Sequence, residues 1–273
     1  MRKILISLLA VSSGYAVASH RVGFQQFDNQ YNLGYGYNEV TVQNGNNTAA
    51  QIDNQTLNLE VERLFDVGVW MDAIVNMNLQ SSTNQSGGMG GQTNGIQPWL
   101  TQDPNFVSLN AKVGYAFEVV TNHLQITPYL TLGRNSNLMA STVAYANNGA
   151  YHNIAQDYYL TMGVGGRLEY RINRAIDLYL DQLVNYNWDQ SNPGTYASVG
   201  SAVAQNTMLW TTTLGAKFNI VKNLQLGING FYTSYQQLAT APNDIGALGA
   251  SSGVGIYRPN YAFGGMINVG LTY

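Results

Sequence analysis

Ten charged residues occupy alternate positions inside apolar segments, so each lies on the opposite face from its apolar neighbours. Six are acidic and four are basic: Glu60, Glu62, Asp72, Glu169, Asp177, Asp181, Lys112, Arg167, Arg171 and Lys217. Charges that share a narrow interior must pair or stay hydrated, because an isolated charge in a dry site costs several kcal/mol. A charged constriction that selects ions or small solutes would satisfy this requirement, and so would a salt-bridged plug. The residue types leave both arrangements open.

Histidine is the other residue type that could carry chemistry, and the chain has three: His20, His123 and His152. Only His152 lies in a predicted long loop, where it could face a loop aspartate as in a protease (Asp103, Asp189 or Asp244). One loop histidine among scattered acids favours a protein that is not an enzyme, and a protease is the weaker alternative. The sequence has no cysteine, no phosphate-binding glycine loop and no spaced metal-ligand set, so we expect no cofactor and no metal.

The elements that position these charges are predicted to be strands, because apolar and polar residues alternate with a period of two. In the clearest segment, Leu160, Met162 and Val164 alternate with Thr161 and Gly163. Ten strands are predicted, at residues 30–43, 54–65, 69–80, 105–117, 124–134, 157–171, 175–188, 206–220, 224–237 and 261–273. An extra hairpin in the loop at 135–156 would raise the count to twelve, and residues 22–27 could add a short strand.

Two predicted strands carry irregularities. In the first, the alternation shifts near Asn38–Glu39, and a bulge there would bring Val40 and Val42 onto the apolar face. In the fifth, Pro128 removes a backbone donor, so we expect the pairing to be disturbed beside it. The predicted connections alternate between short turns and long loops, which is typical of membrane barrels.

The last residues, 261–273, read YAFGGMINVGLTY, alternate strictly and contain no charge. This segment resembles the C-terminal strand of Gram-negative outer-membrane β-barrels, which ends in an aromatic residue after apolar residues at every second position. The resemblance implies recognition by the barrel-insertion machinery. The strand must also pair with the first strand, because an open edge would leave unsatisfied backbone groups in lipid. The closing strand of a soluble β-sandwich is the alternative for this segment alone.

Aromatic residues end each strand that runs towards the short turns: Phe65, Phe117, Tyr170, Phe218 and Tyr273. Such rings are favoured at the boundary between lipid and water, so we predict that the five form a periplasmic aromatic girdle. Chance placement in a β-rich chain is the alternative, which the matching strand ends disfavour.

The composition agrees with a membrane barrel. Only 10% of the 273 residues are charged, the mean hydropathy is −0.13, and no apolar run is long enough for a membrane helix. A net charge of −3 argues against a nucleic-acid partner. The N-terminus has a basic start, a short apolar core and an A-x-A pattern, which together predict a cleaved signal peptide. We therefore divide the chain into a signal peptide at 1–18, a periplasmic lead-in at 19–29 and a barrel at 30–273.

The fold class that follows is all-β: a transmembrane, antiparallel, up-and-down β-barrel in the outer membrane of a Gram-negative bacterium, with short periplasmic turns and long extracellular loops. Ten strands lie nearer to barrels filled by side chains than to open pores, although inward glycines such as Gly165 and Gly215 would leave some space. We expect a narrow porin-like channel for ions or small polar solutes. A non-conducting structural or adhesive surface barrel is the alternative, because the long loops carry little charge and loops often carry recognition. The expected partners are membrane lipid, the insertion machinery, and small solutes or host surface ligands.

Overall fold

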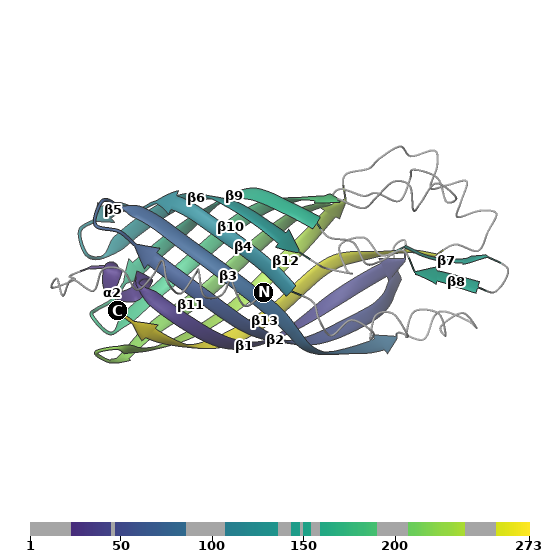
Figure 1. Cartoon of the computed structure of the whole chain (residues 1–273), viewed down its shortest axis with the longest axis horizontal. Coiled ribbons are helices and arrows are strands. Elements are labelled where there is room, and N and C mark those ends of the chain that lie inside the picture. Colours follow the sequence, from purple (N-terminus) through teal and green to yellow (C-terminus); the bar gives the residue numbers. More distant parts are fainter. Residues whose placement is uncertain are drawn as a thin grey trace, which may run out of the picture.

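Ten long strands close into one antiparallel barrel in the computed structural model (Figure 1). The structure describes residues 23–44, 47–85, 107–135, 143–147, 150–153, 159–189, 207–237 and 255–273. The wall consists of β1 (Gln30–Asn44), β2 (Asn47–Leu64), β3 (Val69–Gln85), β4 (Val107–Tyr115) continued by β5 (Phe117–Val120), β6 (Leu124–Asn135), β9 (Tyr159–Arg171), β10 (Ile176–Asp189), β11 (Thr207–Val221), β12 (Leu224–Gln237) and β13 (Gly255–Thr272). The predicted ten-stranded barrel is confirmed.

The barrel closes where β1 pairs with β13, from Gln30 opposite Thr272 to Asn44 opposite Tyr257. Every strand of the wall therefore has a partner on both sides, which a sheet in lipid requires. Polar residues at the strand ends extend some strands past their predicted limits. β2 begins at Asn47 rather than at residue 54, and β3 runs to Gln85 rather than to residue 80.

A separate hairpin, β7 (Val143–Asn147) and β8 (Ala150–Asn153), lies within residues 135–156, where an extra hairpin was one of the predicted alternatives. Besides its pairing with β8, β7 pairs with the start of β13, at Gly255 and Ile256. It lies beyond the barrel wall, at the end opposite to the C-terminus (Figure 1). The hairpin therefore leaves the number of wall strands at ten.

The described part of the lead-in forms a short helix, α2 (Gln25–Asp28), so the alternative of a strand at residues 22–27 is wrong. Phe24 and Phe27 point into the barrel and are 1% and 0% exposed. Their burial favours a helical turn, because two rings three residues apart then lie on the same side. In the described part of the chain, no helix is long and apolar enough to cross a membrane.

The bulge predicted near Asn38–Glu39 is wrong. The register of β1 is continuous there, and it shifts three residues later, between Thr41 and Val42. Val40 faces the lumen and is only 5% exposed. The alternation continues because Asn38 has a partner inside the barrel: it accepts a hydrogen bond from Nδ2 of Asn54 at 2.9 Å.

The irregularity predicted beside Pro128 is confirmed. Pro128 pairs in register with Gly166 on one side, but on the other side the strand breaks between β4 and β5. At the break, the backbone N–H of Ala116 donates to the carbonyl oxygen of Gly68 at 2.8 Å, which continues the pairing with the β3 side. The missing donor of proline thus interrupts one ladder without opening the wall.

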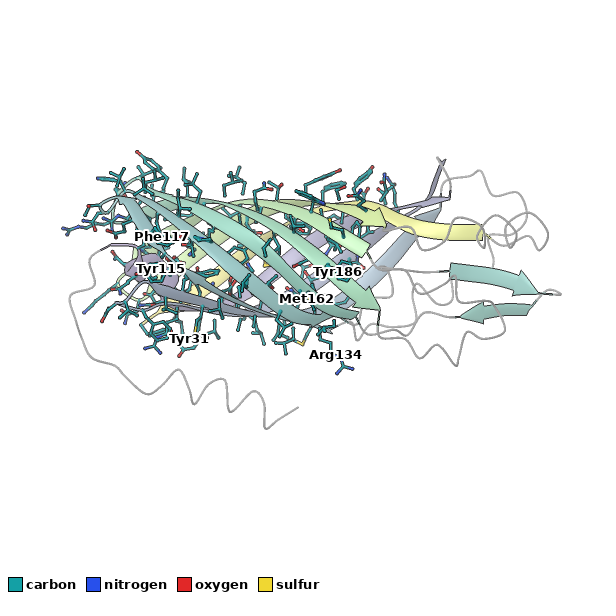
Figure 2. The ribbon with its side chains drawn as sticks, turned by 90° about the horizontal axis from the view of Figure 1, so that it is seen from above. Tyr31, Tyr115, Phe117, Arg134, Met162 and Tyr186 are labelled. Atoms are coloured by element: carbon teal, nitrogen blue, oxygen red, sulfur yellow. The ribbon has the colours of Figure 1, made fainter. Side chains whose placement is uncertain are left out.

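The outer wall is apolar along the middle of the barrel (Figure 2). Leu130, Leu214 and Val164 are 66%, 64% and 57% exposed. Most fully buried groups are polar or charged and lie inside. This inside-out pattern suits a barrel with lipid outside, because lipid-facing and lumen-facing residues alternate along each strand.

Candidate functional site

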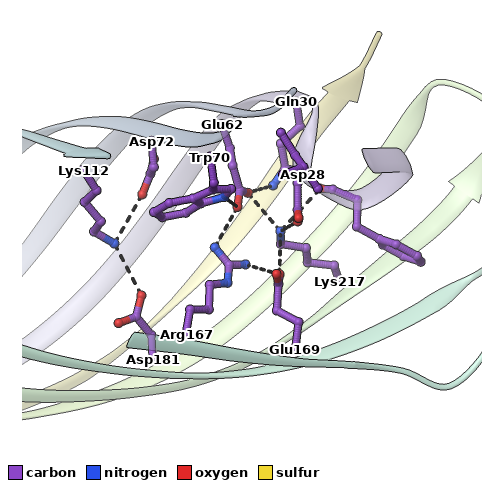
Figure 3. Close-up of polar contacts among 12 residues, drawn as sticks. Asp28, Gln30, Glu62, Trp70, Asp72, Lys112, Arg167, Glu169, Asp181 and Lys217 are labelled. Atoms are coloured by element: carbon purple, nitrogen blue, oxygen red, sulfur yellow. Dashed lines mark hydrogen bonds and ion pairs between the residues drawn. The ribbon is translucent and has the colours of Figure 1, made fainter. Parts of the chain in front are cut away.

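Four charged residues from three strands meet at the short-turn end of the lumen. Nη1 of Arg167 lies 2.7 Å from Oε1 of Glu62, and its Nη2 lies 3.0 Å from Oε1 of Glu169. The ammonium of Lys217 lies 2.9 Å from Oε2 of Glu62 and 3.6 Å from Oε1 of Glu169. These residues come from β2, β9 and β11, and their side chains cross the lumen (Figure 3).

A second group lies beside the first and centres on Lys112 of β4. Its ammonium is 3.2 Å from Asp72 and 3.5 Å from Asp181. The hydroxyl of Tyr129 also donates a hydrogen bond to Asp181. Together the two groups, with Asp28, make what we call the ion-pair layer: Asp28, Glu62, Asp72, Lys112, Arg167, Glu169, Asp181 and Lys217. In this layer all three cations contact at least two carboxylates each.

The lead-in completes the layer through Asp28 of α2, whose Oδ1 lies 2.9 Å from the ammonium of Lys217. Burial raises the pKa of Asp28 to about 8, with a further rise from the nearby Glu169, while Lys217 acts in the opposite direction. Lys217 also donates to the backbone oxygen of Phe27 at 3.3 Å. The helix is therefore fixed to the barrel by a charged contact and by its two buried rings.

The carboxylates of Asp28, Glu62 and Glu169 lie close enough together to suggest a metal site, with their oxygens within 4.8 Å of one another. The ammonium of Lys217 contacts all three, and Arg167 contacts two. These cations supply the positive charge that a metal ion would otherwise bring. The arrangement therefore gives no reason to place a metal there.

The remaining three predicted charges lie at the edges of the layer. Glu60 accepts a hydrogen bond from Nδ2 of Asn32 at 2.8 Å and lines the lumen. The guanidinium carbon of Arg171 lies 5.7 Å from the centre of the Phe24 ring. Asp177 is fully buried, and neither of its carboxylate oxygens has a hydrogen-bond partner in the described part of the chain.

Several residues that hold the layer together were missed in the sequence. Trp70 and Gln30 donate to Glu62 at 3.0 and 2.6 Å, and Gln125 donates to Glu169 at 2.8 Å. All three are at most 1% exposed. Their inward positions could have been read from the alternation, but neutral side chains give no signal of which charge they would meet.

The inward glycines do not leave empty space, because neighbouring side chains lie flat over them. A Cβ built on Gly165 would come within 2.3 Å of the ring of Tyr129, and one built on Gly215 within 2.4 Å of the ring of Tyr179. Each tyrosine is the direct cross-strand partner of its glycine. The glycines thus let large rings lie along the wall instead of across the lumen.

Beyond the layer, the lumen holds a cavity of about 410 Å³, which extends towards the end with the long connections. We call it the vestibule. Its floor is the ion-pair layer, and its walls include Asn58, Asn76, Ser108, Leu183, Leu209 and Phe231. The cavity is about the size of the smaller sites that hold small molecules, which span about 300–1,000 Å³.

The residues of the predicted girdle lie on the outside of the barrel near the short turns. Phe117, Tyr170 and Tyr273 are 52%, 51% and 37% exposed, and Phe117 is seen near one end of the barrel in Figure 2. Phe65 and Phe218 are half-buried. The guanidinium of Arg63 lies 4.5 Å from the centre of the Phe65 ring and 6.0 Å from that of Tyr273.

No protein-family model and no curated protein sequence matches this chain. Solved structures with a similar shape include the β domain of the Bordetella autotransporter BrkA, with a TM-score of 0.49 and 13% identity over 90% of this chain and 100% of that one. Others are an outer-membrane channel from Pseudomonas putida F1 (0.40; 10% identity; 93% and 97% coverage) and the outer-membrane protease OmpT from Escherichia coli (0.37; 9%; 89% and 94%).

At these identities the likenesses concern the fold alone, and the chain's own architecture carries the assignment. The barrel is closed and antiparallel, its outer wall is apolar, and its buried charges lie inside. An apolar wall with no open edge is what the hydrocarbon region of a membrane demands. The chain is therefore a closed antiparallel β-barrel with the apolar outer wall of a membrane-spanning barrel, and no family is distinguished.

Proposed function

We propose that the protein is a surface barrel of the outer membrane whose lumen does not conduct in the conformation observed. The supporting observation is the complete burial of the layer at the short-turn end. Glu62, Glu169, Trp70 and Phe27 are each 0% exposed, so solvent reaches them from neither end. Ions cannot pass a layer whose central carboxylates, Glu62 and Glu169, are enclosed by other side chains. This favours the non-conducting structural or adhesive barrel over the narrow channel.

The pairing within the layer gives a second reason. A selective constriction needs charges that face water, so that a passing ion can exchange its hydration shell for them. Here Arg167 is held by two carboxylates and Lys112 by two others. Opening a path would break several buried ion pairs at once, and breaking one such pair costs about 3–5 kcal/mol.

A narrow channel is the second candidate, and the vestibule is the observation that favours it. Its polar walls would suit small hydrated solutes, and α2 is attached mainly by Phe24, Phe27 and Asp28. A channel would therefore require α2 and the ion-pair layer to move. Catalysis is not part of the proposal. Nδ1 of His123 lies 3.2 Å from the backbone oxygen of Arg171, and the side chain of His152, on which a protease would depend, lies outside the described side chains.

Planar-bilayer recording of the refolded mature chain tests the proposal. We expect no unitary conductance steps at either polarity. A variant that lacks residues 23–28 tests whether α2 alone closes the lumen, and we expect it to be silent too, because the strand-borne ion pairs remain. Reproducible steps from the intact chain would refute the proposal. Steps seen only after the deletion would identify α2 as the closing element.

A further inference from the structure

The two sides of the vestibule differ in chemistry. Around the barrel, β2, β3 and β4 lie opposite β10, β11 and β12, because the strand order places them half a circuit apart. The first side contributes mainly polar and charged side chains to the cavity, whereas the second contributes Leu183, Leu209 and Phe231 among polar residues such as Asn185 and Thr211. A molecule in the vestibule would meet hydrogen-bonding groups on both faces and the larger apolar groups on the second.

The polar side carries a row of side chains linked across three strands. Nδ2 of Asn58 donates to Oδ1 of Asn76 at 2.8 Å, and Nδ2 of Asn76 donates to Oγ of Ser108 at 3.1 Å. The three residues are direct cross-strand partners, so the row follows the register of the sheet. Asn58 begins the row; it is 4% exposed, and its own Oδ1 has no hydrogen-bond partner in the described part of the chain.

The opposite side carries the larger apolar and aromatic side chains, set among polar ones. Phe231 of β12 and Tyr179 of β10 both line the cavity, together with Leu183 and Leu209. Tyr179 lies flat against Gly215, and its ring faces the guanidinium of Arg167 at 4.4 Å. An apolar wall with a few aligned polar groups opposite is the usual composition of a small-molecule site.

The floor of the vestibule selects against charged ligands. The cations that reach the cavity are Lys112, Arg167 and Lys217, and each already contacts carboxylates. An anion would therefore have to displace a buried ion pair, which costs several kcal/mol. A cation would meet Glu62, Asp72 and Asp181, which these bases already neutralise, and Glu60, which Asn32 contacts.

We propose that the vestibule is a binding site for a neutral polyhydroxylated ring, that is, a saccharide without a charged group. The hydroxyl groups of such a ring donate and accept hydrogen bonds, which matches the amide and hydroxyl row of Asn58, Asn76 and Ser108. Its C–H face packs against an apolar or aromatic surface, which Phe231 and the leucines supply. This proposal depends on the proposed function in one respect: the ion-pair layer that closes the lumen also forms the floor of the binding site.

The test is titration calorimetry of the refolded mature protein with maltose as the neutral probe and glucuronate as the anionic one. The detergent must have no sugar head group, since such a head group would itself compete for the site. We expect saturable binding of maltose and at least tenfold weaker binding of glucuronate. Absence of saturable maltose binding to the intact protein, or equal binding of glucuronate, would overturn the proposal.

Variants on both walls locate the binding. Asn76→Leu removes the centre of the polar row, and Phe231→Ala removes the ring opposite; each should weaken maltose binding at least tenfold. Phe263→Ala is the matched control, because Phe263 is 44% exposed on the outer wall. If Asn76→Leu does not refold, Ser108→Ala tests the same row with a smaller change. Binding that survives both lumen variants would place maltose elsewhere and contradict the assignment. Conductance is a separate readout, so failure here leaves the non-conducting barrel to be judged on its own recordings.

Discussion

Replacing Lys217 by methionine should destabilise the barrel by about 3–5 kcal/mol, the usual cost of removing one partner from a buried ion pair. The contacts show where this cost arises. Without Lys217, Glu62 keeps Arg167, Gln30 and Trp70, and Glu169 keeps Arg167 and Gln125. Asp28 keeps only the amide of Gln125 at 3.3 Å. Asp28 is thus the one carboxylate left without a cation.

The measurement is the urea midpoint of unfolding in lipid vesicles at pH 9, above the pKa of about 8 of Asp28, so that this acid is ionised in the intact chain. The double variant Lys217→Met/Asp28→Asn removes both the cation and the stranded acid, so most of the lost stability should return. Lys222→Met is the control, since Lys222 lies in an exposed turn and should change stability by less than about 0.5 kcal/mol. Two results would contradict this role of the layer. One is a wild-type urea midpoint for Lys217→Met, and the other is a lower midpoint for the double variant than for the single one.

Three further predictions follow from packing, titration and closure. Gly165→Ala should cost about 1–3 kcal/mol, because its Cβ would meet the ring of Tyr129 at 2.3 Å, whereas Gly166→Ala, with open space at its Cβ, should be nearly neutral in the same unfolding assay. The pKa of Asp28 is raised from 3.8 to about 8, so the native chain holds a proton that the unfolded chain has released; this contribution to stability is full below pH about 4 and is lost as the pH rises through about 8. Asp28→Asn should therefore flatten the pH dependence of the urea midpoint, and an unchanged slope would show that other groups dominate. Deleting Tyr273 should lower the yield of membrane-inserted barrel in a heat-modifiability gel, because its ring lies 4.8 Å from that of Tyr31 at the closing seam, and normal insertion would contradict this role.

The number and order of the wall strands could be predicted because period-two alternation depends only on local sequence. Strand prediction from alternation was most accurate where apolar and polar residues strictly alternate, as at Leu160–Val164 in β9. It failed where both faces are polar, and the extension of β2 back to Asn47 was missed for this reason. The hairpin of β7 and β8 remained one of two alternatives in the sequence, because strands of five and four residues are too short to show a clear alternation.

Local irregularities were predictable only when covalent structure forces them. Pro128 has no N–H, so a disturbed ladder beside it follows from the residue itself. The shift expected at Asn38–Glu39 rested on hydropathy, and it did not occur there. Val40 points into the lumen, where a valine contributes to the apolar part of the vestibule wall. An apolar residue thus need not face lipid where the lumen wall also holds apolar side chains, as Val40 does beside Ala262.

The sequence alone could not distinguish a pore from a plug, because the two differ in how the inward charges pair. Alternation turns Glu62, Arg167 and Lys217 inward, but their pairing depends on how strands far apart in sequence face one another. Glu62 and Arg167 are 105 residues apart and lie on strands that are not neighbours in the wall. The last contribution comes from Phe27 and Asp28, in a segment whose four-residue helix has no repeating pattern. A charge set of the same composition would have formed a hydrated constriction in a wider barrel. Enclosure of the charges is therefore a consequence of barrel width and of α2, and both act only in the assembled fold.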